Sequence, residues 1–126
     1  MLEIKNISKT YNRQGKNFFA VKDVNLNISH GDFIHIIGRS GSGKSTFLNI
    51  VAGLLSADNG TLLLDGTNYL ELNDEEKSKF RNKNIGFIPQ SPALLGYLNI
   101  LENIRLPYDM YEKDGDSEGK ARYFLN

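Results

Sequence analysis

The chain has 126 residues, 40% of them hydrophobic, which is the size and composition of one globular domain with its own core. Lysine plus arginine and aspartate plus glutamate balance at 15 each, so the net charge of zero gives no electrostatic support for a nucleic-acid partner. The sequence contains no cysteine, which excludes disulfides and thiol chemistry, and no apolar run reaches the roughly 20 residues of a membrane-spanning helix.

Three strands are predicted ahead of the first glycine-rich motif. Apolar positions at residues 2–7 predict one strand, and the rough alternation of residues 19–28 predicts a second. The polar residues 12–17 between them predict a turn or loop. After another polar turn, the apolar residues 33–37 predict a buried strand. We therefore expect two antiparallel strands that lead into a third.

Residues 38–46, GRSGSGKST, match the phosphate-binding loop pattern G-x-x-x-x-G-K-[ST]. The glycines let consecutive N–H groups point into one concavity, which is a nest for phosphate oxygens. Lys44 would reach the β- and γ-phosphates of a nucleotide, and the Ser45 hydroxyl would ligate Mg²⁺. Apolar residues at helical spacing from Phe47 to Leu55 predict a helix whose positive end faces the anion. The expected phosphate contacts are Gly38, Ser40, Gly41, Ser42, Gly43, Lys44, Ser45 and Thr46.

A strand, a helix and another strand are predicted after this loop. Residues 61–64 predict a short strand. Asn73 is typical of a helix N-cap, and Glu76 stands three residues later, where the second half of a capping box belongs. The mostly charged helix is expected over residues 74–81, with a solvent-facing surface. The apolar residues 85–89 predict a further strand.

A second capping box, Asn99 with Glu102, predicts another helix. This helix is expected to stop before Pro107, because proline disfavours the helical conformation in the residue that precedes it. A last helical pattern starts at Lys120 and runs to the end of the sequence.

Two residues outside the loop are candidates for binding a nucleotide. Gln90 follows the predicted strand 85–89, at the end where ligands collect in open α/β sheets, and its amide oxygen could ligate Mg²⁺ or its amide orient a water. Tyr11 could stack on a nucleobase, with Ala20 and Val21 as the apolar side of the same pocket. The alternatives are a solvated loop glutamine and a partly buried core tyrosine.

These features together resemble the N-terminal half of an ATP-binding cassette (ABC) transporter ATPase. Tyr11 stands at the position of that family's adenine-stacking aromatic, residues 37–48 resemble its phosphate loop, and residues 85–90, IGFIPQ, resemble its Q-loop strand. The resemblance implies an α/β fold, a P-loop NTPase (RecA-like) core with an N-terminal antiparallel β subdomain. It also implies ATP and Mg²⁺ as ligands, Lys44 and Gln90 as catalytic residues, and Ser45 and Gln90 as metal ligands.

A subfamily resemblance suggests what the ATPase works with. Residues 93–95, ALL, and 101–107, LENIRLP, resemble the exporters of macrolides, lipoproteins and antimicrobial peptides. The resemblance implies a transmembrane permease subunit, a homodimer of ATPase domains and a position on the cytoplasmic side of the cell membrane, held there by the permease.

Several of the family's motifs are expected beyond residue 126: its signature motif, its Walker B strand with the catalytic glutamate, and its switch histidine. We therefore interpret residues 1–126 as the N-terminal portion of a single ABC ATPase domain, truncated before Walker B. Nucleotide binding without turnover is the expectation for such a chain, because the water-polarising carboxylate lies outside the loop.

Other phosphate-loop proteins fit the sequence less well. A GTPase should carry N-K-x-D for guanine, and residues 82–85, NKNI, lack the aspartate. A nucleoside kinase usually has its loop nearer the N-terminus, without two preceding antiparallel strands. A non-catalytic module that binds a nucleotide or a partner remains an alternative.

Overall fold

The computed structural model describes residues 1–91, 94–111 and 115–125, so Ala93 of the subfamily resemblance and Asn126 of the last helical pattern lie outside the described residues. The chain divides into two compact units, Met1–Arg81 and a second one that begins at Asn82.

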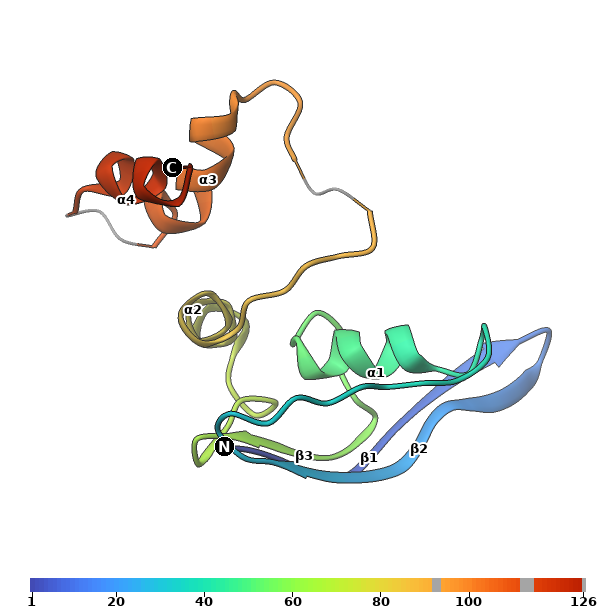
Figure 1. Ribbon diagram of the computed structural model, residues 1–126. Coiled ribbons are helices and arrows are strands. Elements are labelled where there is room, and N and C mark those ends of the chain that lie inside the picture. The colour runs from blue at the N-terminus through green and yellow to red at the C-terminus, as the bar shows by residue number, and fades with distance from the viewer. Residues whose placement is uncertain (92–93, 112–114, 126) are drawn as a thin grey trace. The chain divides into compact units, whose positions relative to one another are not determined.

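The N-terminal unit is built on a four-stranded sheet in the order β2-β1-β3-β4 (Figure 1). Its strands are β1 (Leu2–Arg13), β2 (Lys16–Ile28), β3 (Asn59–Leu64) and the short β4 (Thr67–Asn68), and all neighbours are antiparallel. The two predicted N-terminal strands are thus confirmed as an antiparallel pair.

The β1–β2 hairpin is longer than predicted, because residues 12–17 are mostly strand rather than loop. Its turn contains only Gln14 and Gly15, whose φ angles of 52° and 78° are both left-handed. Such a two-residue turn matches the twist of the flanking strands and keeps them paired up to Arg13 and Lys16.

The α1 helix (Lys44–Val51) lies over the sheet, and apolar side chains from both are buried in the core (Figure 1). Ile4, Ile7 and Leu62 come from the strands, and Phe47 and Ile50 come from the helix. The helix ends before the predicted Leu55. Gly53 has a φ of 68°, a left-handed conformation that glycine adopts readily and that ends helices.

The predicted strand at residues 33–37 is wrong for the part of the chain that the structure describes. Phe33 is 91% exposed and Ile37 is 79% exposed, and no described strand pairs with this segment. The prediction was made from an apolar run alone. A buried parallel strand also needs neighbouring strands to pair with.

The two predicted capping boxes are confirmed. The α2 helix (Asp74–Asn84) follows Asn73, whose side chain accepts a bond from the Glu76 N–H at 2.9 Å while the Asn73 N–H donates to the Glu76 carboxylate at 3.1 Å. Asn99 and Glu102 make the same reciprocal pair, at 2.9 and 2.8 Å, at the start of α3.

The described part of the second unit contains α3 (Ile100–Asp109) and α4 (Ser117–Leu125). Arg105 joins the two helices, because its Nε donates to the Ser117 hydroxyl at 3.1 Å. The predicted end of α3 before Pro107 is wrong: the proline lies within the helix, which continues for two residues and closes on a bond from the Met110 N–H to the Leu106 carbonyl. The predicted strand 85–89 is also wrong for the described residues.

Across the described residues, every helix is too short or too polar to span a membrane.

Candidate nucleotide-binding site

The glycine-rich loop leads into α1 through two glycines whose backbone conformation is left-handed. Gly41 has a φ of 77° and Gly43, the N-cap of α1, has a φ of 89°. Within the described part of the chain, no side chain caps the helix at Gly43, and the first turn carries no acidic residue. The first N–H groups of a helix lack intrahelical partners and lie at the positive end of its dipole, so this end of α1 suits an anion.

The Lys44 ammonium lies over the same loop. Its Nζ donates to the carbonyls of Gly38 at 2.9 Å and Arg39 at 2.7 Å, and lies 3.4 Å from the Ser42 hydroxyl. The side chain thus folds back across the loop that leads into its own helix, which places a positive charge beside the N–H groups of α1.

A cavity of about 240 Å³ brings the loop together with the hairpin. Tyr11, Phe18 and Ala20 line it from β1 and β2. The loop and the first turn of α1 line the rest, with Gly41, Ser42, Gly43, Lys44, Ser45 and Thr46. The cavity therefore has an aromatic side and a side rich in N–H, hydroxyl and ammonium donors. These groups fit a nucleotide, with its base at the rings and its phosphates at the loop.

A bulge in β2 brings the hairpin to the loop. The register passes from Thr10↔Phe19 to Lys9↔Val21, which leaves Ala20 as the extra residue. The Ala20 carbonyl lies so close to Gly43 that a Cβ at Gly43 would stand 1.9 Å from that oxygen. Only a glycine allows this approach of the two main chains.

An ion pair supports β1 beside Tyr11. The Asp58 carboxylate accepts bonds from the Lys9 ammonium at 2.6 Å and from the Thr10 N–H at 2.7 Å. The hydrogen bond from Lys9, followed by that from Thr10, lowers the pKa of Asp58. Lys9 Nζ also lies 6.0 Å from the centroid of the Tyr11 ring, the outer limit for a cation–π contact.

Not every predicted site residue lines this cavity. Val21 is buried and lines a larger cavity of about 630 Å³ together with Gly38 and residues 34–37, whereas Ala20, which was predicted beside it, lines both cavities. Ser40 lies in the exposed turn of the loop. Gln90 belongs to the second unit, so its role next to Ser45 stays a prediction.

Phe18 is the lining residue that the sequence analysis missed. It faces Tyr11 because the turn at Gln14 and Gly15 has only two residues. The signal was weak, since Gln-Gly is not among the strong dipeptides for such turns, which are Asn-Gly, Asp-Gly and Gly-Gly.

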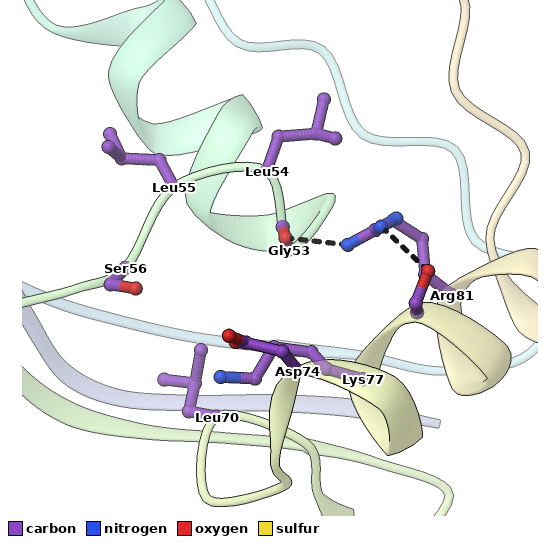
Figure 2. Close-up of a pocket in the computed structure, with 9 residues that line it drawn as sticks. Gly53, Leu54, Leu55, Ser56, Leu70, Asp74, Lys77 and Arg81 are labelled. Carbon is purple, nitrogen blue, oxygen red and sulfur yellow. Dashed lines mark hydrogen bonds between the residues drawn. The ribbon is translucent and has the colours of Figure 1, made fainter.

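A third cavity, of about 310 Å³, lies at the opposite, C-terminal end of α1 (Figure 2). Its described lining includes none of the residues predicted to bind nucleotide. Arg81 reaches across from α2 and donates to the Gly53 carbonyl at 2.9 Å (Figure 2). Nearby, the Tyr69 hydroxyl donates to the carbonyls of Ile50, at 2.9 Å, and Val51. Both side chains therefore secure the end of the helix that carries Lys44.

A family model described as "ABC transporter" matches residues 21–125. The uncharacterized ABC transporter ATP-binding protein MJ0796 of Methanocaldococcus jannaschii is 40% identical over 122 residues, which are 97% of this chain and 52% of that protein. The lipoprotein-releasing system ATP-binding protein LolD of Alcanivorax borkumensis is 37% identical over 97% of this chain and 53% of its own. The macrolide export ATP-binding/permease protein MacB of Mannheimia succiniciproducens is 38% identical over 97% of this chain and 19% of its own.

The fold of this chain is also similar to that of a solved ATP-binding cassette. The dimeric post-hydrolysis state of the ATP-binding cassette MJ0796, bound to ADP and Pi, superposes with a TM-score of 0.88 at 39% identity, over 98% of this chain and 53% of that one. The chain thus has the fold of about half of such a cassette, and it spans about half the length of the first relatives that it matches.

Proposed function

The chain belongs to the ABC transporter family, and we propose that it binds ATP with Mg²⁺ in the cavity between the β1–β2 hairpin and the glycine-rich loop. The observation that carries the proposal is that one cavity contains both the Tyr11 ring and residues 41–46. In the whole protein, this binding and the hydrolysis that follows drive transport across a membrane.

The phosphates are bound by the loop. The N–H groups at the start of α1 and the Lys44 ammonium donate to phosphate oxygens, and Lys44 exchanges the carbonyls of Gly38 and Arg39 for the β- and γ-phosphates. These donors stabilise negative charge on the phosphates, which is the main requirement of phosphoryl transfer. Ser45 and Gln90 are the protein groups that would hold Mg²⁺, which would offset negative charge on the phosphates.

The base is bound at the aromatic end. The Tyr11 ring is 38% exposed, although it lies in a cavity wall, so it has free surface for stacking.

Gln90 would act on the attacking water in the complete domain, whose P-loop NTPase core we propose to be RecA-like.

Partners and location follow from the family. We propose that the whole protein forms a homodimer of ATPase domains, which is supported by the dimeric solved structure. A transmembrane permease is the second partner, and it holds the ATPase at the cytoplasmic face of the cell membrane. MacB, whose name combines ATP binding with a permease, supports this part of the proposal.

Isothermal titration calorimetry of the chain with ATP and Mg²⁺ tests nucleotide binding. Lys44→Ala should weaken ATP binding at least about tenfold, because a charge-assisted hydrogen bond contributes about 1.5–3 kcal/mol. Lys16→Ala is the matched control: it removes the same charge from the exposed hairpin end, where Lys16 pairs with Arg13 across the strands.

The proposal fails if the unsubstituted chain binds no ATP, or if both variants bind it as the unsubstituted chain does. Phosphate release, measured on the same samples, separates an ATPase from a module that binds nucleotide without hydrolysing it.

A further inference from the structure

We propose that Phe18 forms a second aromatic wall of the base-binding end, so that the nucleotide base contacts two rings, those of Tyr11 and Phe18. The inference rests on the proposed function, because it assigns a further residue to the same site.

The register of the hairpin places both rings on one face. Tyr11 and Phe18 are direct cross-strand partners in β1 and β2, and directly opposite residues of a pair project to the same side of the sheet. Their ring centroids lie 6.1 Å apart with an angle of 36° between the planes. The contact is within the range of aromatic pairs, and it leaves the two faces at an angle to each other.

Both rings keep exposed surface inside the cavity. Phe18 is 47% exposed and Tyr11 is 38% exposed, and both line the 240 Å³ cavity with residues 41–46. Exposed aromatic surface beside a phosphate-binding loop gains free energy when an apolar ring covers it.

The tilt of the rings defines how a base would fit. A base that stacks on Tyr11 meets the Phe18 ring at an inclined angle, because the planes of the two rings are tilted by 36°. Every base has a face to stack, so the two rings provide affinity without reading hydrogen-bonding groups.

Phe19 provides a matched control within the same strand. Its side chain projects to the opposite face from that of Phe18, because successive residues of a strand alternate. Phe19 is 57% exposed, and the Lys22 ammonium lies 5.4 Å from its ring centroid. Phe19 is not among the described residues that line the cavity.

The test is a calorimetric titration of the chain with ATP and, separately, with inorganic tripolyphosphate, each with Mg²⁺. Phe18→Ala should weaken ATP binding roughly 5- to 100-fold, the factor expected for the loss of one ring–base contact. Its affinity for tripolyphosphate, which has no base, should stay unchanged. Phe18→Tyr should restore ATP binding, and Phe19→Ala should bind ATP as the unsubstituted chain does.

Each of the other possible results contradicts either the role of Phe18 or the proposed function. Equal ATP affinity of Phe18→Ala and the unsubstituted chain removes Phe18 from the site and leaves nucleotide binding intact. Equal losses for ATP and tripolyphosphate mean that Phe18 only supports the loop, which also overturns the inference. Failure of the unsubstituted chain to bind ATP overturns the proposed function itself.

Discussion

Tyr69 is the residue that most clearly links the core to the candidate site. Its side chain is fully buried, it stacks on Phe80 with a centroid distance of 5.7 Å, and its hydroxyl donates to carbonyls at the end of α1. The Ile50 carbonyl also accepts a bond from the Gly53 N–H at 2.9 Å, so the Tyr69 hydroxyl adds to the hydrogen bonds that close this end of the helix. The position of Lys44 at the other end of the helix thus depends on a core residue.

Tyr69→Phe should destabilise the chain by about 0.5–1.5 kcal/mol, because it removes a buried hydrogen bond while keeping the ring. Urea denaturation at neutral pH measures the free energy of unfolding. Tyr97→Phe, which removes a hydroxyl from a side chain that is 82% exposed, is the control and should change nothing. Equal stabilities of the two variants would contradict the role of the Tyr69 hydroxyl.

The same residue predicts a pH dependence. Burial raises the pKa of Tyr69 from 10.0 to about 12, with Arg81 acting in the opposite direction. The folded chain therefore keeps a proton that the unfolded chain releases, so this contribution to stability is complete below pH 10 and is lost between pH 10 and 12. In that window the unsubstituted chain should lose on the order of 2 kcal/mol more than Tyr69→Phe, which denaturation curves at each pH will measure.

At the scale of single residues, sequence reasoning was best where a motif sets the chemistry. Tyr11 and residues 41–46, which were predicted to bind one nucleotide, line one cavity, and their role in binding stays a prediction. Phe18 was missed because its position depends on the register of a two-residue turn, and Val21, which was predicted together with Ala20, does not line this cavity because a bulge changes which residue faces the loop. Neither the register nor the bulge has a strong local signature.

Among the elements, the β1–β2 hairpin and α1 depend on each other for position. The bulge at Ala20 places the Ala20 carbonyl in close contact with Gly43, the N-cap of α1, where there is no room for a Cβ atom. This contact sets how the aromatic rings of the hairpin lie relative to the glycine-rich loop.

Gly43→Ala should therefore destabilise the chain more than Gly41→Ala does. Both glycines are left-handed, so alanine costs about 1–2 kcal/mol at either position. At Gly43 the new Cβ also clashes with the Ala20 carbonyl, whereas at Gly41 it meets nothing within 4 Å. Thermal denaturation of both variants gives the comparison, and equal losses would show that the hairpin does not dock on Gly43.

Elements with local signals were predicted well, and those that need distant partners were not. The capping boxes at Asn73 and Asn99 mark their helices through side chains three residues apart. Residues 33–37 and 85–89 have strand-like composition, yet a strand forms only when another strand pairs with it, and sequence periodicity does not report on that partner.

At the scale of the whole molecule, we propose that the base and the phosphates of ATP bind in one cavity of the N-terminal unit. One competing location is the 310 Å³ cavity at the other end of α1, which includes Asp74, Lys77 and Arg81. The two cavities share no lining residue among those described, so a map of perturbed residues separates them.

The most direct test of this claim is an NMR titration of the ¹⁵N-labelled chain with ATP and Mg²⁺. The largest changes in amide chemical shift should fall at residues 41–46, with accompanying changes at Tyr11 and Phe18. Largest shifts at residues 53–56 and Arg81, or the absence of shifts at saturating ATP, would contradict it.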